Sequence, residues 1–227
     1  MSSEINFQFI RPFGPVICKV TMPKDIIENL NDYVDQIIKD EKKGKELNHG
    51  KNLAGNVQQE FRLEKDFIEK SRWGIFLSSC AKAWIKQVLN EEISKFQLIS
   101  TWIVRQFQND YNPIHTHGGH LSGVGYLKIP KNFGEYHQKD KVNNQNGKLA
   151  LVHGSKMFMQ ESTYIITPKV GDFYFFPNYL MHTVYPFSGT DEERRSISFN
   201  ARIDDDIFNV FKNLIKNYQS FYTNLTT

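Results

Sequence analysis

Hydrophobic positions in the first hundred residues recur mainly at helical spacing. Between residues 26 and 38 apolar side chains follow one another at steps of three and four, behind Pro23, as in a helix with one buried face. Gly44 is the predicted end of that helix. Apolar pairs within 80–89 predict a second helix, and the polar, Gly- and Asn-rich stretch 46–61 between the two helices is predicted to be a loop.

After Phe96 the pattern changes to short β-branched and aromatic runs separated by Pro, Gly, Asn and Asp. Seven of these runs are predicted strands: QLISTWIVRQFQ, SGVGYLKIP, GKLALVHG, TYIITP, GDFYFFP, HTVYPF and RRSISFNARI. So many strands within roughly a hundred residues favour a sandwich or small barrel over a parallel α/β sheet. A last helix is predicted from Ile207 to Tyr218, and helices from both ends are expected on the outer face of the sheet.

No internal repeat or linker divides the 227 residues, so we expect a single domain. Residues 1–96 are predicted to form a helical support, residues 97–203 a β core, and residues 204–227 a C-terminal helix.

Composition narrows the class of protein. The net charge is +3 and no basic block stands out, so nucleic acid is not an expected partner. Cys18 and Cys80 lie far apart in apolar surroundings, which favours reduced thiols over a disulfide. The N-terminus lacks the pattern of a signal peptide, and no window approaches the roughly 20 apolar residues of a membrane span. We therefore expect a cytoplasmic protein, in the host cytoplasm if the gene is viral, without membrane contact.

The stretch NPIHTHGGHLSGVGYL, residues 112–127, holds three of the seven histidines. His115 and His117 are two residues apart, so in extended chain both side chains project to one face. His120 follows two glycines, so its direction is not fixed. A metal needs further ligands, and the best candidate is His182, at the start of another predicted strand.

The other histidines have no such setting. His49 and His137 lie in polar loops and are expected in solvent, while His153 is expected to be an ordinary surface or core residue. His115 and His117 have a simpler interpretation too, as polar loop residues ahead of a strand. Their shared face, the flanking glycines and a distant partner favour a metal site instead. Neutral imidazoles suit Zn, Cu, Fe or Ni, so the ligands alone do not select the metal.

The run RRSISFN suggests an anion site. Arg194 and Ser196 share one strand face, and Arg195 lies on the other. A guanidinium binds a carboxylate in a bidentate fork, and a mostly apolar interior would bury an arginine only where an anion meets it. The alternative is that Arg194 is a surface charge beside Glu192 and Glu193.

The chain contains, in this order, the segments H-x-H, SGVGYL, GDFYFFPNYLMHTV and RRSISFN. In this order the segments resemble those of the 2-oxoglutarate and Fe(II)-dependent oxygenases. The similarity is greatest to the prolyl-4-hydroxylase-like branch and to uncharacterised members from marine phages and bacteria, and it covers about residues 102–202. It implies a double-stranded β-helix, that is, a cupin-like jelly-roll barrel, mainly β with flanking helices. This agrees with the strand count. It also implies Fe(II) and 2-oxoglutarate as cofactors.

The resemblance implies roles for individual residues. His115 and His182 match the two metal histidines of the family. Arg194 matches the basic residue that pairs with the far carboxylate of 2-oxoglutarate, with Ser196 as its neighbour in an R-x-S arrangement. Tyr126 matches a tyrosine whose hydroxyl often contacts the same carboxylate, although a strand aromatic in the core is an equal interpretation.

His117 departs from the family pattern, which has Asp or Glu at that position. It can replace the carboxylate and give a three-histidine site, or stay off the metal and leave the third position to water or another anion, or mark an inactive site. We favour the three-histidine site, because an imidazole on the correct face is a competent ligand. Three neutral ligands leave the charge of Fe(II) less compensated.

The implied activity is an O₂-dependent hydroxylation that releases succinate and CO₂. The resemblance raises a peptide prolyl residue as substrate, with a free amino acid, a nucleobase or a sugar still open. The loop Leu47–Glu60 and the hairpin 132–148 are expected to form the rim that selects this substrate. Two alternatives remain: a three-histidine cupin-like dioxygenase that needs neither 2-oxoglutarate nor Arg194, and a non-catalytic jelly-roll binding module.

Overall fold

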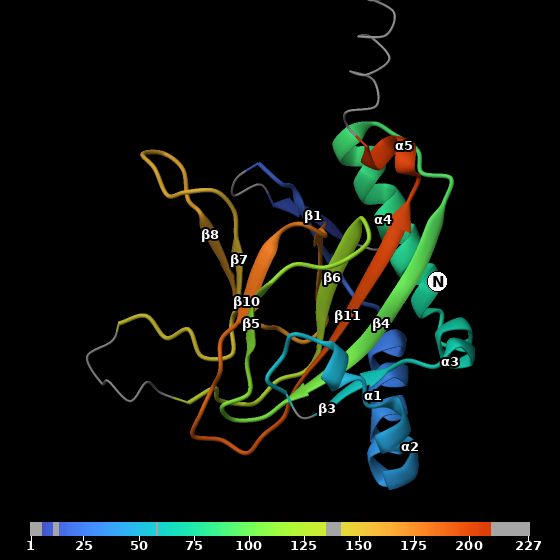
Figure 1. The fold of residues 1–227 in the computed structure, drawn as a ribbon, viewed down its shortest axis with the longest axis vertical. Coiled ribbons are helices and arrows are strands. Elements are labelled where there is room, and N and C mark those ends of the chain that lie inside the picture. The colour runs from blue at the N-terminus through green and yellow to red at the C-terminus, as the bar shows by residue number, and fades with distance from the viewer. Residues whose placement is uncertain (1–5, 11–13, 58, 135–141, 210–227) are drawn as a thin grey trace, which may run out of the picture.

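The computed structural model describes residues 6–10, 14–57, 59–134 and 142–209, and two antiparallel sheets form its centre (Figure 1). The large sheet has the order β1-β2-β9-β6-β11-β4-β3, and the small sheet has the order β5-β10-β7-β8. The large sheet consists of β1 (Phe7–Ile10), β2 (Ile17–Thr21), β3 (Gln59–Arg62), β4 (Phe96–Gln106), β6 (Leu121–Lys128), β9 (Asp172–Pro177) and β11 (Arg194–Ile203). The small sheet consists of β5 (Asn112–His115), β7 (Leu149–Val152), β8 (Thr163–Ile166) and β10 (Met181–Val184).

The helices lie on the far side of the large sheet from the small sheet (Figure 1). They are α1 (Lys24–Lys39), α2 (Glu41–Leu47), α3 (Lys65–Lys70), α4 (Trp73–Leu89) and α5 (Asp205–Phe208), with a 3₁₀ turn η1 (Gly50–Asn52). From β4 onward the chain crosses repeatedly between the two sheets, which is the connectivity of a jelly roll. The predicted fold class is therefore confirmed, although the two sheets face each other without joining into a closed barrel.

Alternation along the strands gives the protein two hydrophobic cores. Phe173 and Phe175 of β9 face the helices, where they pack with residues such as Trp73 of α4. Tyr174 and Phe176 face the small sheet and belong to the second core. Because successive side chains point to opposite faces, one strand serves both cores. The space between the sheets also holds the candidate site.

All seven predicted strands are present, and so are the two predicted N-terminal helices. The prediction that Gly44 ends the first helix is wrong. That helix ends at Lys39, and the Asp40 side chain accepts a hydrogen bond from the Lys43 backbone N–H, which starts α2 across Gly44.

The N-terminal region is also less helical than predicted. Strands β1 and β2 extend one edge of the large sheet, and β3 forms the other edge inside the stretch predicted to be a loop. Because the residues of β3 are mostly polar, the sequence gives no strand pattern from which its pairing with β4 could be predicted. Of the predicted helix from Ile207 to Tyr218, only the start falls within α5, and residues 210–227 lie outside the described part of the chain.

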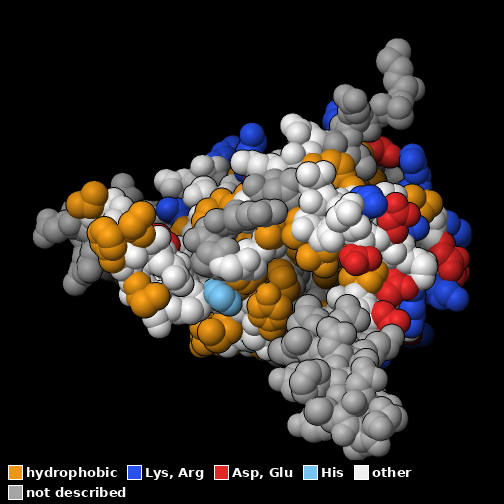
Figure 2. All heavy atoms as spheres, turned by 90° about the horizontal axis from the view of Figure 1, so that it is seen from above, with side chains coloured by type: hydrophobic (Ala, Val, Ile, Leu, Met, Phe, Trp, Pro, Cys, Tyr) orange, Lys and Arg blue, Asp and Glu red, His pale blue; other side chains and the backbone are white. Residues whose placement is uncertain are grey.

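Cys18 and Cys80 are buried free thiols, as predicted, and burial raises the pKa of each to about 12. Within the described residues, no helix is long and apolar enough to cross a membrane. Charged side chains gather over the helical side of the molecule, whereas hydrophobic ones are prominent at the other end, near the β7–β8 hairpin (Figure 2). That hairpin exposes Phe158 and Met159 almost completely.

Candidate functional site

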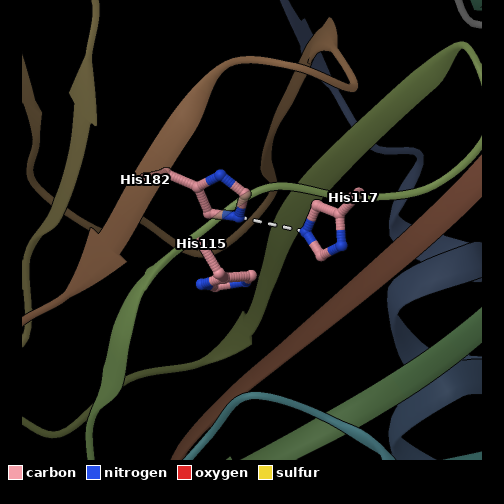
Figure 3. Close-up of side chains that lie close together, drawn as sticks. All are labelled: His115, His117 and His182. Carbon is pink, nitrogen blue, oxygen red and sulfur yellow. Dashed lines mark hydrogen bonds between the residues drawn. The ribbon is translucent and has the colours of Figure 1, made fainter.

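The three histidines singled out in the sequence meet between the two sheets. His115 of β5 and His182 of β10 are direct cross-strand partners, with ring centroids 4.3 Å apart. His117 follows β5, and its Nε2 lies 3.0 Å from the Nε2 of His182. The potential ligand atoms all lie within 4.8 Å of one another, and the rings border a common space (Figure 3). No Asp or Glu joins this cluster in the described part of the chain.

Backbone carbonyls orient two of the imidazoles. The Nδ1 of His115 lies 2.7 Å from the carbonyl oxygen of Pro113, and the Nδ1 of His182 lies 2.9 Å from that of Leu180. A carbonyl only accepts, so each Nδ1 carries the proton and donates it. The Nε2 atoms are then left with free lone pairs, as in histidines that bind metals.

Burial and the neighbouring imidazoles keep the rings of His117 and His182 neutral. Burial, together with the neighbouring imidazoles of His182 and His115, lowers the pKa of His117 to about 3. Burial and His115 lower the pKa of His182 to about 4. Both side chains are therefore unprotonated at neutral pH, which is the form that binds a metal ion.

The loop that carries His117 is anchored at both ends. The His117 N–H donates to the carbonyl of Asn178 at 3.0 Å, and the Asn178 side chain donates back to the His117 carbonyl at 3.2 Å. Gly119 has a φ of +88°, and a Cβ there would lie 2.7 Å from the Ala201 carbonyl oxygen. Only glycine fits position 119 without strain, so Gly119 shapes the loop and supplies no ligand itself.

Arg194 lies on the inner face of β11, only 1% exposed, and lines the same cavity of about 40 Å³ as the three histidines and Ser196. The alternative that it is a surface charge is therefore wrong. Its Nη1 donates to Oε1 of Gln106, while its Nε and Nη2 have no hydrogen-bond partner among the described residues. Burial lowers its pKa, and the neighbouring Tyr126 opposes that effect.

Tyr126 is fully buried and lies directly opposite Ser196 in the pairing of β6 with β11. The guanidinium carbon of Arg194 lies 5.1 Å from its ring centroid, and the Tyr126 hydroxyl has no hydrogen-bond partner within the described residues. Burial raises the pKa of this hydroxyl, so it is a neutral donor. Tyr126 is therefore a core aromatic whose hydroxyl has no partner among the described residues, and its contact with the cosubstrate stays a prediction.

The remaining histidines that the structure describes do not reach the cluster. His120 is buried elsewhere, where it accepts a hydrogen bond from the Ile203 N–H and stacks on Phe208 with centroids 3.8 Å apart. His49 is half-buried and bonds to Asn52, so its predicted exposure to solvent is only partial. His153 is half-buried, as its interpretation allowed, and His137 lies outside the described residues.

Sequence reasoning missed two polar residues of the site. Gln106 holds Arg194, and Asn112 lines the cavity and accepts a hydrogen bond from Gln106 at 3.0 Å. A signal existed for Gln106: counted in steps of two from Trp102, it follows the apolar Trp102 and Val104 as a polar residue on the same face of the strand. Asn112 and Asn178 carried no comparable signal.

Comparison with protein families agrees with this geometry. Residues 100–200 match the family described as "Putative 2OG-Fe(II) oxygenase", and this segment contains the three histidines, Tyr126, Arg194 and Ser196. No curated protein matches the chain.

Solved structures with the same fold include enzymes of this type. A prolyl-4-hydroxylase from Pseudomonas putida matches with a TM-score of 0.52 at 14% identity, over 82% of this chain and 92% of its own. A prolyl hydroxylase from Trichoplax adhaerens, in complex with a hypoxia inducible factor peptide fragment, has a TM-score of 0.51 at 14% identity, over 84% of each chain. HygX from Streptomyces hygroscopicus, with nickel and 2-oxoglutarate bound, has a TM-score of 0.51 at 11% identity, over 81% of this chain and 80% of its own.

Fold and site together define a jelly-roll protein with a histidine cluster beside a buried arginine. Residues 100–200 of this protein match the model of the 2-oxoglutarate and Fe(II)-dependent oxygenases. The match indicates an oxidoreductase that uses Fe(II) and 2-oxoglutarate as cofactors. The family named from the sequence is confirmed.

Proposed function

We propose that His115, His117 and His182 bind Fe(II), and that Arg194 binds the distal carboxylate of 2-oxoglutarate with help from Ser196 and Tyr126. One observation carries this proposal: three imidazoles, whose potential ligand atoms lie within 4.8 Å of one another, share a cavity with an arginine that has two unused donors. When bound, the metal and 2-oxoglutarate supply an O₂-dependent oxidation of a substrate C–H bond, with release of succinate and CO₂.

The residues present fit this metal. Histidine nitrogens bind such ions at about 2.0–2.1 Å, so the 3.0 Å between the Nε2 atoms of His117 and His182 lets both reach one ion. The Nδ1 protons of His115 and His182 are held by backbone carbonyls, which keeps these two rings from turning away. His117 stands where the family has a carboxylate, and its orientation toward His182 supports the three-histidine arrangement over the one that leaves it off the metal.

The residues also fit the cosubstrate. A buried guanidinium with no carboxylate partner in the described chain leaves a positive charge to be neutralised, and a dicarboxylate supplies the anion. Apolar residues of the cavity wall, such as Phe176 and Leu149, exclude water from the reacting atoms. The cavity of about 40 Å³ is far below the usual 300 Å³ or more of a ligand pocket, so binding must displace side chains of its wall.

The substrate we propose is a small molecule or a peptide, with a peptide prolyl residue first. Support comes from the prolyl hydroxylases that share the fold, one of them in complex with a peptide fragment. The predicted rim loop Leu47–Glu60 does reach the site: the Asn56 N–H donates to the Tyr111 carbonyl, and Gly55 lies against Asn112 of the cavity wall. The other predicted rim, the hairpin 132–148, lies partly outside the described residues.

An anaerobic titration of the protein with Fe(II) and then 2-oxoglutarate tests this function. We expect a weak visible absorption band from the chelate, and we expect His115→Ala or His182→Ala to abolish it. His117→Asp restores the usual family ligand, so a faster turnover of 2-oxoglutarate would identify His117 as the substitute for the carboxylate. A protein that binds Fe(II) but gives no band with 2-oxoglutarate would contradict the proposal.

The all-histidine cluster also fits a second function, that of a metal dioxygenase that does not use 2-oxoglutarate. Such an enzyme has no need of a carboxylate clamp. Arg194→Ala would leave its rate unchanged, whereas the proposed enzyme would lose its cosubstrate.

A further inference from the structure

The buried Arg194 is held by a neutral side chain. Its Nη1 donates to Oε1 of Gln106, and Gln106 is itself only 1% exposed. No ion pair of Arg194 exists within the described residues, although it lies in a region where other buried arginines have carboxylate partners. A neutral acceptor fixes the guanidinium without cancelling its charge.

Gln106 is in turn held across the gap between the two sheets. Its Nε2 donates to Oδ1 of Asn112 on β5 at 3.0 Å, and the Asn112 carbonyl accepts from the Thr183 hydroxyl of β10 at 2.7 Å. The orientations of both amides are determined. Arginine has no acceptor, so Gln106 must present its oxygen to Arg194, and its NH₂ group then requires the oxygen of Asn112.

The far end of this chain of hydrogen bonds meets the rim loop. The Nδ2 of Asn112 is turned away from Gln106, and a Cβ built on Gly55 would lie 2.7 Å from it. Glycine at position 55 therefore lets the loop close onto Asn112 without displacing it. The same Cβ would lie 3.2 Å from Oε1 of Glu60, so the contact is crowded on two sides.

We propose that Gln106 and Asn112 are positioning residues for the cosubstrate. They hold Arg194 so that its Nε and Nη2 remain free for an incoming carboxylate, and their neutrality leaves the full positive charge of Arg194 available to it. The proposal rests on the proposed function, because it assigns these residues to 2-oxoglutarate binding. It adds a consequence: an acid in place of Gln106 would compete with the cosubstrate for Arg194.

Two variants of one residue separate positioning from simple packing. Gln106→Met keeps the volume and removes the hydrogen bonds, while Gln106→Glu keeps the shape and adds a competing charge. The matched controls are Gln97→Met and Gln97→Glu, at an exposed position of the same strand β4. Each protein is loaded anaerobically with Fe(II), checked for metal content and melting temperature, and titrated with 2-oxoglutarate by calorimetry.

We expect Gln106→Glu to weaken 2-oxoglutarate binding about tenfold or more, because its carboxylate competes with the cosubstrate for Arg194, with Fe(II) binding retained. Gln106→Met should weaken it a few-fold, and the Gln97 variants should match the wild type. In turnover of 2-oxoglutarate, the KM should rise while the rate at saturation is retained.

A second ligand tests the charge argument directly. 2-Oxopentanoate has the same 2-oxo acid group without the distal carboxylate, so Gln106→Glu should leave its binding unchanged while binding of 2-oxoglutarate falls. A purely structural defect would weaken both ligands alike and would overturn the proposal.

The loop contact has its own variant. Gly55→Ala should raise the KM for 2-oxoglutarate a few-fold by displacing Asn112, whereas Gly74→Ala, where the nearest atom is 3.6 Å from the new Cβ, should not.

The outcomes separate this proposal from the function on which it rests. If the wild type binds no 2-oxoglutarate, the proposed function is wrong and this proposal with it. If the wild type binds and Arg194→Met does not, but Gln106→Glu binds as tightly as the wild type, then only the role of Gln106 is wrong.

Discussion

Arg194 and Arg195 are adjacent on β11 and almost equally buried, yet they face opposite environments. Arg195 points toward the helices, where it donates to both carboxylate oxygens of Glu193 and lies 2.7 Å from Asp35 of α1. Arg194 points toward the small sheet, where its partners among the described residues, Gln106 and Tyr126, are both neutral. The same charged group thus has carboxylate partners on one face of the strand and neutral partners on the other.

This difference separates stability from function. A buried charge is strongly unfavourable unless a partner compensates it. On the outer face the partner is part of the chain, so the ion pairs contribute to folding. On the inner face the partner is missing from the described chain, so the charge is available to a ligand. Two buried glutamates differ in the same way. Glu193, on the outer side, is paired with an arginine. Glu60 of β3 lies opposite the inward-facing Val104, and its Oε2 has no partner among the described residues.

The largest effect is expected from Arg194→Met. Removing one member of a buried charge pair weakens binding by about 2–5 kcal/mol, so 2-oxoglutarate affinity should fall roughly 30-fold or more. The melting temperature should stay the same or rise, because an uncompensated charge is replaced by an apolar side chain. Anaerobic calorimetry with the Fe(II)-loaded protein measures the first quantity. If the affinity stays within a few-fold of the wild type, the charge of Arg194 does not serve to bind 2-oxoglutarate.

Arg195→Met should have the opposite profile. It leaves Glu193 buried with Arg105 as its remaining close partner, and breaking a buried pair lowers the free energy of unfolding by about 3 kcal/mol. The affinity for 2-oxoglutarate should stay within about twofold of the wild type. Urea unfolding measures the loss, and Lys128→Met is the control, because Lys128 is a half-exposed and distant partner of Glu193, worth at most about 1 kcal/mol. Equal stability of the Arg195 and Lys128 variants would contradict the pairing argument.

The sequence was sufficient to separate the two arginines, because strand parity follows from a two-residue period. The same period put His115 and His117 on one side, and strand-like patterns correctly located all seven predicted strands of the jelly roll. Where a residue's role depends on its own strand alone, pattern is enough. Whether these histidines bind a metal stays a prediction, as does the division of the chain into one domain with helical ends.

Long-range pairing was beyond the pattern. That His182 lies directly opposite His115 follows from β5 pairing with β10, and β5 was read only as the entrance to a strand. Strand β3 was missed because its residues are polar and because it becomes a strand only at the edge provided by β4. Gln106 and Asn112 acquire their role from a contact between sheets, which no local period encodes.

Acid sensitivity should come from the outer face. Burial raises the pKa of Glu193, but hydrogen bonds and charges from Arg105 and Arg195 outweigh it and lower the pKa to about 2. A carboxyl whose pKa is depressed in the folded state stabilises the protein above its unfolded value of 4.5, and this stabilisation is lost as the pH falls toward 2. The difference corresponds to about 3 kcal/mol. Unfolding measured from pH 6 to pH 2 should show a smaller loss in Glu193→Gln than in the wild type, and parallel curves would rule out this role.

On the inner face, the change of stability with pH should have the opposite direction and be smaller. Burial, with a further contribution from Asp110, raises the pKa of Glu60 to about 7. A raised carboxyl pKa means that the folded state binds its proton more tightly, so stability falls as the pH rises from 4.5 through 7. Glu60→Gln should therefore unfold like the wild type at pH 5 and be more stable than the wild type at pH 8. The expected gain in stability is about 1–2 kcal/mol, less than the full pKa difference implies, because the adjoining loop can relax and admit water to the carboxylate. Glu161→Gln, at an exposed pair with Lys156, should change stability by less than about 0.5 kcal/mol at either pH. If Glu60→Gln is instead less stable at pH 8, the ionised carboxylate has a partner, and the division between a paired outer face and an unpaired inner face does not extend to β3.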